Sequence, residues 1–464
     1  MSLDTASPLI VLVSTYESGH QPLGLAAPAA ALRARGHEVA CLDLAAQDAD
    51  VELLRRAAMV GISVPMHTAA RLGVALARRV RALNPRAHIA FYGLYAWPLR
   101  ERLHEEGLAD SVAGGEYEPR LCELAGAVAS PNSPASEGQF ALAFPRQHYP
   151  VPDRTGLPGL DRYARLVHGS REVPAGYVEA SRGCAHTCTH CPITPIYGGR
   201  LRLVQPEVVL ADIDQQVAAG AGHITFGDPD FFNARPHSLA IAEEFHRRHP
   251  DLTFDATIKV EHLVEHADAL PRLRELGCLF VTSAFESLNP KILGMLEKGH
   301  TPDDIERALD LAEDAGLFLR PTWMAFTPWT SLNDIVETLD FVERRGLVRH
   351  VQPVQYALRL LLPPGSPLIE IAAAQGLLDG FDADGLTYTW HNPDPRVDAL
   401  QAQLADLTAA AASTHEEHPV PAEETFAAAR QLVGPMPSGA PSKAVSVAPR
   451  PQRPVPGLTE AWFC

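Results

Sequence analysis

Three cysteines stand within eight positions of the 464-residue chain, in the stretch SRGCAHTCTHC at residues 181–191. Thiolates this close together are typical metal ligands, and two arrangements are open. Cys184, Cys188 and Cys191 complete a tetrahedral zinc site if His186 or His190 supplies a fourth ligand. Alternatively, the three thiolates hold three irons of a 4Fe-4S cluster, whose fourth iron stays free to bind a small molecule.

The rest of the composition is that of a globular protein from a reducing compartment. The chain has seven cysteines, three of them clustered, which does not suggest a disulfide framework. The N-terminus lacks the basic start of a signal peptide, and no stretch has the eighteen apolar residues of a membrane span. The formal net charge of -17 argues against a surface for nucleic acid. We therefore expect a cytoplasmic protein that binds neither membranes nor nucleic acids.

The elements that position the cysteines begin with a first α/β series. From Pro8 the apolar runs PLIVLV, HEVACLDL, MVGISV and AHIAFYG alternate with helical patterns. This alternation predicts a Rossmann-like parallel sheet, covered by helices on both faces, over residues 1–130. Residues 131–173, rich in Pro, Gly and Arg, are expected to form a connector.

A second α/β series begins at Tyr177 and carries the cysteines. Its apolar runs are YVEAS, HITFG, LTFDATI, LFVTSAF, FLRPTWMAF and VQPVQYALRL. Six strand–helix repeats predict a partial (β/α)6 barrel over residues 174–366, with its active site at the C-terminal ends of the strands. The cysteine stretch follows the first of these strands. A helical segment is expected over residues 367–433, followed by a disordered Pro-rich tail over residues 434–464.

The Cys-x3-Cys-x2-Cys spacing after the first strand of a barrel resembles the radical S-adenosylmethionine (radical SAM) family. The resemblance covers roughly residues 177–367. It implies a 4Fe-4S cluster on Cys184, Cys188 and Cys191, with S-adenosylmethionine (SAM) bound at the open iron. It also implies reductive cleavage of SAM to a 5'-deoxyadenosyl radical, with electrons from an external donor such as flavodoxin or ferredoxin. The substrate, a small molecule or a peptide, and the catalytic residues stay unidentified.

Further stretches resemble the SAM-binding motifs of that family. FGDPDFF, after the second strand, is similar to the stretch that meets the SAM amino group. It contributes Gly227, Asp228, Pro229 and Asp230 as candidate cofactor-binding residues. AFESLNPKILGMLEKGHT, after the fourth strand, resembles the stretch in which Glu286 and Ser287 would face the ribose.

Three more residues are candidates for the SAM site. His190 stands between the second and third cysteines, where the family usually places an aromatic residue against the adenine. Arg320 and Lys259, at predicted strand ends, are candidate partners of the SAM carboxylate or charges outside the site. The glycine-rich stretch that the family shows after its fifth strand is absent from TWMAFTPWTSLND.

The N-terminal unit resembles the cobalamin-binding domain that precedes the barrel in one radical SAM subclass, which makes cobalamin a further candidate cofactor. Two features depart from that domain. The Asp-x-His-x-x-Gly pattern of a lower axial histidine is missing, since His20 precedes Gly24 by four positions. Tyr92, Tyr95 and Trp97 stand where small residues would make room for the corrin ring.

The end of the chain resembles a more specific group. The stretches GISVPMHTA, FYGLYA, FGDPDFFN and LTEAWFC are similar to radical SAM proteins named for a tail ending in Cys-Cys-Ala-Glu-Pro, or with selenocysteine as the second residue. In that group the selenocysteine would follow Cys464. The resemblance therefore implies a selenocysteine tail interrupted at its stop codon, and the alternative is an ordinary C-terminal cysteine.

These patterns together predict a radical SAM enzyme that methylates or otherwise modifies an unidentified substrate, with cobalamin as a candidate cofactor. The alternative is a zinc-stabilised binding or scaffold protein without catalytic activity.

Overall fold

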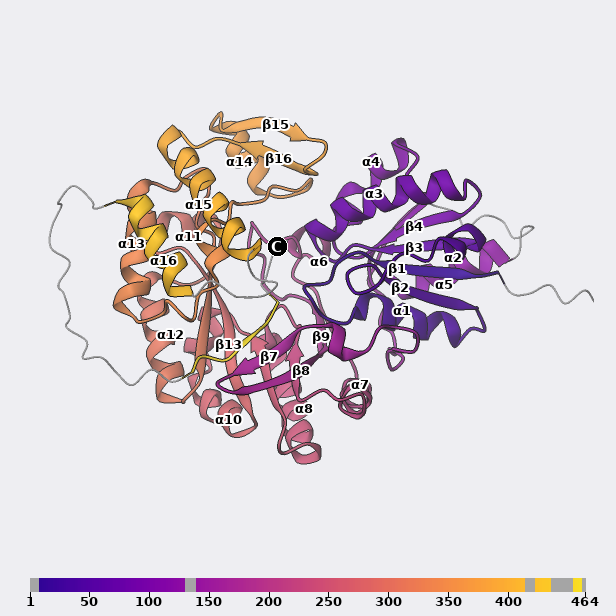
Figure 1. The fold of residues 1–464 in the computed structure, drawn as a ribbon, viewed down its shortest axis with the longest axis horizontal. Helices are drawn as coiled ribbons and strands as arrows, with labels where there is room; N and C mark the ends of the chain where they lie inside the picture. The colour runs from indigo at the N-terminus through magenta and orange to yellow at the C-terminus, as the bar shows by residue number, and fades with distance from the viewer. Residues whose placement is uncertain (1–7, 130–138, 414–421, 435–453, 461–464) are drawn as a thin grey trace, which may run out of the picture.

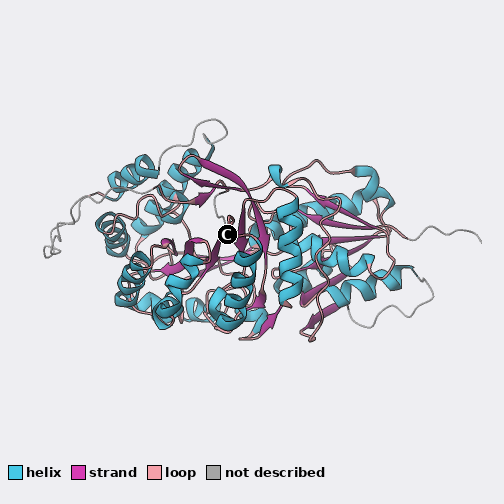
Figure 2. Ribbon diagram, turned by 90° about the horizontal axis from the view of Figure 1, so that it is seen from below, coloured by secondary structure: helices cyan, strands magenta, loops and turns pink. Residues whose placement is uncertain are grey.

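The computed structural model describes residues 8–129, 139–413, 422–434 and 454–460. Two α/β units lie side by side, and a mostly helical segment packs on the second unit (Figures 1 and 2). Within the described ranges, no helix combines the length and the apolar character needed to cross a membrane.

The first unit is an open parallel sheet. Its strands are β1 (Ile10–Ser14), β2 (Val39–Asp43), β3 (Met59–Ser63), β4 (His88–Tyr92), β5 (Ser111–Gly115) and β6 (Phe140–Ala143). They are ordered β2-β1-β3-β4-β5-β6, and every neighbouring pair is parallel. The predicted Rossmann-like sheet is confirmed. The connector adds to it, because β6 lies within residues 131–173.

Helices cover both faces of this sheet, which explains its uninterrupted apolar strands. They are α1 (Leu23–Arg33), α2 (Val51–Arg56), α3 (His67–Leu83), α4 (Arg100–Glu105) and α5 (Glu118–Ala129), with η1 (Trp97–Leu99) before α4. Ile10 and Leu12 pack toward α1 and α5, and Val11 and Val13 pack toward α2, α3 and α4. Burying each such side chain contributes about 1.5–3 kcal/mol.

The second unit is a partial barrel. Its strands are β7 (Arg165–His168), β8 (Arg171–Val178), β11 (His223–Phe226), β12 (Thr253–Thr257), β13 (Cys278–Glu286), β14 (Phe318–Trp323) and β17 (Gly457–Leu458). The order is β14-β13-β12-β11-β8-β7-β17, and the strands from β8 to β14 are parallel. A short hairpin of β9 (Ser181–Gly183) and β10 (Leu201–Leu203) follows β8 and carries the cysteine stretch. The predicted partial barrel is confirmed.

The predicted sixth barrel strand does not form. The segment VQPVQYALRL instead contains the 3-10 helix η5 (Pro353–Tyr356), and one parallel bridge joins Phe326 to Arg359. Pro353 explains the difference, because proline has no N–H for a sheet ladder and suits the first turn of a helix.

Helices surround the barrel strands. They are α6 (Thr194–Tyr197), α7 (Pro206–Ala218), α8 (Arg235–Arg248), α9 (Val260–Glu265), α10 (Leu270–Glu275), α11 (Pro290–Met295), α12 (Pro302–Asp314) and α13 (Leu332–Arg344), with η2 (Leu160–Arg162), η3 (Phe231–Ala234) and η4 (Ala267–Ala269). Capping boxes start α12 at Thr301 and α13 at Ser331, each closed by an aspartate three residues later. Such caps are worth about 1 kcal/mol each.

The segment after the barrel is helical, as predicted, with one exception. It contains α14 (Leu368–Ala374), α15 (Pro395–Ser413) and α16 (Ala422–Val433). Between α14 and α15 lies an antiparallel hairpin of β15 (Leu378–Asp382) and β16 (Thr387–Trp390). This hairpin reaches the first unit, where His67 Nε2 lies 2.6 Å from the carbonyl oxygen of Gly385.

Part of the expected disordered tail is ordered. Residues 454–460 lie against the barrel, and β17 pairs with the edge strand β7. The Thr459 N–H donates to the Arg165 carbonyl at 2.9 Å, and the Arg165 N–H donates to Thr459 Oγ1 at 3.0 Å. The Pro-rich composition conceals this segment, since two paired residues leave no periodic signal.

Candidate active site

A cavity of about 590 Å³ lies between the two α/β units. It is bounded by the C-terminal strand ends of the barrel, by the loops after β1, β3, β4 and β5, and by the tail residues Leu458 and Glu460. Its volume is in the range of ligand-binding sites. Cys184, Cys188 and Cys191 all line it, so the sequence motif and the cavity coincide.

The positions of the three cysteines distinguish between the two metal arrangements. Three atoms can bind one metal ion only if they lie close together. In the part of the chain that the structure describes, the groups of three possible ligand atoms within 4.8 Å of one another contain no cysteine sulfur. Three thiolates on one zinc ion would have sulfurs about 4 Å apart. A 4Fe-4S cluster binds each thiolate to a different iron, which sets the sulfurs farther apart. The three sulfurs are therefore spread more widely than three ligands of one zinc ion would be.

The loop from Cys184 to Cys191, here called the cluster loop, is held on several sides. The Asn233 side-chain amide donates to Cys184 Sγ at 3.4 Å. Thr189 donates to the Met295 carbonyl at 2.7 Å, and Thr194 donates to the Cys188 carbonyl at 2.8 Å. The loop is thus tied to η3 and α11.

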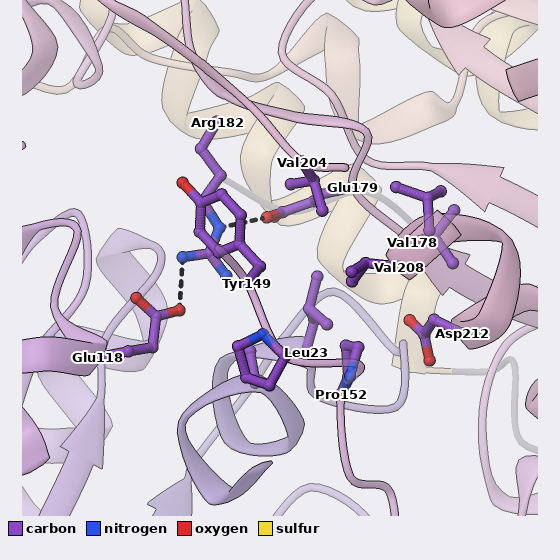
Figure 3. Close-up of a pocket in the computed structure, with 13 residues that line it drawn as sticks. Leu23, Glu118, Tyr149, Pro152, Val178, Glu179, Arg182, Val204, Val208 and Asp212 are labelled. Atoms are coloured by element: carbon purple, nitrogen blue, oxygen red, sulfur yellow. Dashed lines mark hydrogen bonds and ion pairs between the residues drawn. The ribbon is translucent and has the colours of Figure 1, made fainter. Parts of the chain in front are cut away.

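Arg182, two residues before Cys184, joins the barrel to the first unit (Figure 3). Its guanidinium donates to Glu118 Oε1 at 2.5 Å and lies 3.3 Å from Glu179 Oε2 and 3.5 Å from Glu116 Oε2. The ring of Tyr149 stacks on it, with 5.0 Å between the guanidinium carbon and the ring centroid. The small cavity beside these residues measures about 20 Å³, room for a single water, so this region is a packed junction and not a ligand site.

The Gly-Asp-Pro turn after β11 reaches the cavity. Gly227 has to be glycine, because a Cβ there would lie 1.9 Å from the Tyr177 hydroxyl. Asp228 is buried and accepts from the Ala180 N–H at 2.9 Å and from the Ser181 hydroxyl at 2.5 Å. Burial raises the pKa of Asp228 to about 6. The turn therefore fixes the backbone that leads into the cluster loop.

Glu286 forms a buried charged group with two neighbours at the cavity wall. Its Oε1 lies 3.2 Å from Lys298 Nζ and 3.2 Å from His190 Nε2. Burial opposes its ionisation, but Lys298 and His190 outweigh that effect and lower the pKa of Glu286 to about 2. Glu286 also has a φ of 62°, a left-handed conformation that costs a non-glycine residue about 1–3 kcal/mol.

Lys298 was not among the residues predicted from sequence, although it lies in the LEKGHT stretch quoted above. It is buried, and the neighbouring Glu286 outweighs desolvation and raises its pKa. The charges of Cys188 and Cys191 act on it in the same direction. Burial raises the pKa of Cys191 to about 12, and the Lys298 ammonium offsets only part of that effect.

The other predicted residues divide between the cavity and the protein interior. Pro229, Lys259 and Arg320 line the cavity. Asp230 and Ser287 are buried and do not line it: Asp230 caps η3 at the Phe232 N–H, and Ser287 Oγ accepts from the Asn289 N–H at 3.0 Å. Ser287 Oγ and one carboxylate oxygen of Asp230 are thus engaged in local structure.

Arg320 contacts the tail, and not only the barrel. Its guanidinium donates to the Pro456 carbonyl at 2.7 Å and lies over the ring of Phe280. Burial lowers its pKa to about 10. The tail carbonyl is thus a partner of a side chain that sequence reasoning assigned to the SAM carboxylate.

In the first unit, two of the three aromatic residues that departed from the cobalamin-domain pattern do not face the cavity. The Tyr92 hydroxyl donates to the Gly24 carbonyl at 2.8 Å, and its ring packs among the residues under α1 and α5. Trp97 stacks with Arg100 at 4.5 Å. Tyr95 does line the cavity, together with Gly93, whose φ is 104°. Most of the space that these aromatics seemed to close is therefore open.

Near the junction of the two units, the cavity carries neutral groups. Burial raises the pKa of Glu17 to about 8 and that of Glu179 to about 7, and it lowers the pKa of His20 to about 4. Glu17 accepts from the Gly24 N–H at 3.1 Å, and His20 packs on Tyr177 at 4.8 Å. Glu17 and His20 are therefore neutral near pH 7, whereas Glu179, which lies 3.3 Å from the Arg182 guanidinium, is partly ionised.

Two family models match the chain. The Radical SAM superfamily matches residues 178–350, and the B12 binding domain matches residues 9–125. The two matches coincide with the barrel and with the first α/β unit.

Relatives and solved structures agree with this division. An uncharacterized methyltransferase of Pyrococcus horikoshii is 24% identical over 80% of either chain. The hopanoid C-3 methylase of Methylococcus capsulatus is 24% identical over 67% of this chain and 62% of its own length. The radical SAM methyltransferase TsrM from Kitasatospora setae, solved with cobalamin and a [4Fe-4S] cluster, is 18% identical with a TM-score of 0.65, covering 92% of this chain and 99% of TsrM. OxsB, a cobalamin-dependent SAM radical enzyme, is 16% identical with a TM-score of 0.70, covering 91% and 71%. The two structures share the fold.

Glu17 generates a pH-dependent prediction. Burial raises its pKa from the ordinary value of 4.5 to about 8, so the folded state keeps a proton that the unfolded state releases. Stability from this group is complete below about pH 4.5 and is lost as the pH rises toward 8. Glu17→Gln, which mimics the neutral acid, should flatten the decline in melting temperature between pH 5 and pH 8.5. A decline of unchanged size in the variant would contradict the assignment, and Glu38→Gln is the exposed control.

Proposed function

We infer that this chain, a radical SAM enzyme whose barrel adjoins a B12-binding domain, performs cobalamin-dependent methyl transfer to a substrate held in the cavity between the two units. The observation that carries this proposal is the shared cavity. The cluster loop, the Gly-Asp-Pro turn and the loops after β1, β3, β4 and β5 all face the same space. Two cofactors that must exchange a group with one substrate need such a common space.

Each wall of the cavity has its own role in this proposal. Cys184, Cys188 and Cys191 hold a 4Fe-4S cluster, and the turn at Gly227 with Glu286 holds SAM beside it. The loops at Gly24 and Gly93 receive the corrin, where open α/β sheets bind ligands. When bound, these cofactors supply the methyl group and the radical chemistry. The protein orients them, excludes water and provides a neutral acid group at Glu17.

The reaction also requires an electron from outside the chain. A small redox protein such as flavodoxin or ferredoxin is the proposed donor. The substrate is a small molecule or a peptide that fits between the units. Among the similar proteins, TsrM has tryptophan as its substrate and the Methylococcus capsulatus relative is a hopanoid methylase. These proteins support methylation as the reaction class, and they leave the substrate of this chain open.

The cluster loop gives the first functional prediction. Cys184→Ala, Cys188→Ala or Cys191→Ala should each abolish both the brown chromophore and SAM cleavage, because each removes one of three iron ligands. After anaerobic reconstitution with SAM and cobalamin, 5'-deoxyadenosine, S-adenosylhomocysteine and corrin retention are measured. Cys278→Ala is the matched control, since Cys278 is buried in β13 away from the cavity. A triple variant that kept its iron and its activity would refute the cluster assignment.

The corrin site gives another prediction. His20 packs on Tyr177 of the barrel, and the Asp-x-His-x-x-Gly pattern is absent, so we expect corrin binding without a histidine ligand below the cobalt. His20→Ala should leave the absorbance of bound corrin unchanged. Gly93→Val is the positive control: a Cβ there would lie 3.1 Å from the Val64 backbone, so the loop must shift and corrin should be lost. Loss of corrin absorbance in the histidine variant would contradict the proposal.

The tail is part of the proposed active site. Glu460 lines the cavity, accepts from the Tyr16 hydroxyl at 3.2 Å, and packs where Gly19 has no side chain. Cys464 lies outside the described residues, and four extended residues span at most about 14 Å. The tail is therefore proposed to bring a thiol within reach of the cavity, as a redox-active or substrate-holding arm. A selenocysteine after Cys464, which the resemblance implies, would extend the same arm, and the codon after Cys464 tests that part directly.

Docking of the tail can be tested without knowing the substrate. Thr459→Pro removes both hydrogen bonds to Arg165, because proline has neither the N–H that donates to the Arg165 carbonyl nor the hydroxyl oxygen that accepts from the Arg165 N–H. Thr459→Ser keeps both groups. Losing two hydrogen bonds should accelerate hydrogen exchange in β7 by at least about tenfold. Equal rates in Thr459→Pro, Thr459→Ser and the unaltered protein would show that the arm does not dock.

A further inference from the structure

Three side chains from separate segments converge beside the cluster loop. His186 lies within that loop, Asp230 follows β11, and His262 belongs to α9. One nitrogen or oxygen from each lies within 4.8 Å of the other two. His262 Nδ1 is 2.7 Å from Asp230 Oδ2, and His186 Nε2 is 3.7 Å from the same oxygen.

These converging atoms are buried and lack hydrogen-bond partners. Asp230 is completely buried, and its Oδ1 accepts from the Phe232 N–H at 3.0 Å. Its Oδ2, together with His186 Nε2 and His262 Nδ1, has no hydrogen-bond partner of acceptable geometry. The ion pair between His262 and Asp230 compensates part of this burial, but a buried carboxylate oxygen and ring nitrogens without aligned hydrogen bonds are still costly. The arrangement therefore calls for a further partner among the three atoms.

The short distance between His262 and Asp230 is informative because the two atoms are not aligned. A hydrogen bond would direct the ring N–H at the oxygen. When a ring nitrogen and a carboxylate oxygen each bind one metal ion at about 2.1 Å, the two atoms lie about 3 Å apart. The lone pair of the nitrogen then points at the metal, and its direction is about 45–50° from the line to the oxygen. Close approach without alignment is thus the geometry of two ligands that share an ion.

The chemistry of the three donors identifies the ion class. Two imidazoles and one carboxylate form a common zinc ligand set, which leaves one position for water. Glu261 Oε2 lies 3.8 Å from His186 Nδ1, the other ring nitrogen, which is longer than a hydrogen bond, and it accepts from Lys259 at 2.9 Å. We propose that His186, Asp230 and His262 bind one Zn²⁺ ion, separate from the iron–sulfur cluster and without any cysteine ligand.

The position of this zinc site gives it a structural role. The ion joins the cluster loop to the loop after β11 and to α9, three segments that are far apart in the sequence. His186 stands two residues from both Cys184 and Cys188. The ion therefore holds the loop backbone between two iron ligands in place.

Zinc content of purified protein tests the proposal independently of activity. Inductively coupled plasma mass spectrometry should find about one zinc per chain in protein grown with zinc and reconstituted with its cluster. The zinc should remain in the variant with all three cluster cysteines changed to serine. It should be lost in His262→Ala and in Asp230→Asn, because losing a direct ligand costs more than the 10- to roughly 100-fold that outer partners cost. Asp230→Asn keeps the oxygen that caps η3, so the fold is preserved.

Matched controls separate this site from its neighbours. His266 stacks on His262 at 5.3 Å and, with Glu265 and His262, forms a more exposed group of possible ligands. His266→Ala should keep the zinc. Cobalt substitution should give a spectrum without thiolate-to-cobalt charge transfer. Zinc that is lost with the three cysteines or with His266, zinc that is retained in Asp230→Asn, or folded protein that contains no zinc would each overturn the proposal.

Discussion

The buried guanidinium of Arg182 joins the two α/β units. One guanidinium interacts with Glu179 of the barrel and with Glu116 and Glu118 of the first unit, under the ring of Tyr149. A buried ion network is stable only while every partner is present, and removing one partner typically costs about 3–5 kcal/mol. Because Arg182 lies two residues before Cys184, the contact that joins the units also sets the start of the cluster loop. The cavity exists because this junction makes the C-terminal strand ends of both sheets face each other.

The same junction divides the cavity into two electrostatic regions. On the barrel side, Glu286 and Lys298 neutralise each other, and Glu286 stays ionised despite burial. On the junction side, Glu17 and Glu179 have raised pKa values near 8 and 7. The cavity therefore combines a buried ion pair on the barrel side with weakly acidic carboxyl groups on the junction side.

Much of this architecture can be predicted from the sequence, and the exceptions have physical reasons. Strands β1 to β4 and the first five predicted barrel strands are largely buried apolar runs, so their pattern identifies them, whereas β6 is only partly buried and was not predicted. The cysteine triad is identified by spacing alone. The prediction of a sixth barrel strand was wrong because it followed the apolar content of the segment and neglected Pro353, which begins a 3-10 helix. The direction of Tyr92 could not be predicted, since it depends on which face of β4 packs under α1. The role of Arg182 could not be predicted either, because two of its carboxylate partners, Glu116 and Glu118, lie more than sixty positions away.

The tail strand β17 can be recognised only from the three-dimensional structure. β7 is the edge of the barrel sheet, and an uncovered edge exposes unpaired backbone groups that invite pairing with other chains. Gly457 and Leu458 cover that edge, and the Pro456 carbonyl gives the buried Arg320 guanidinium an acceptor. Glu460 then contacts Tyr16 of the first unit, in the space left by Gly19. The segment therefore pairs with the edge strand β7, accepts a hydrogen bond from the buried Arg320 and contacts the first unit at Tyr16. These contacts lie at the wall of one cavity. Such convergence ties the end of the chain to the chemistry of the site, not merely to the stability of the fold.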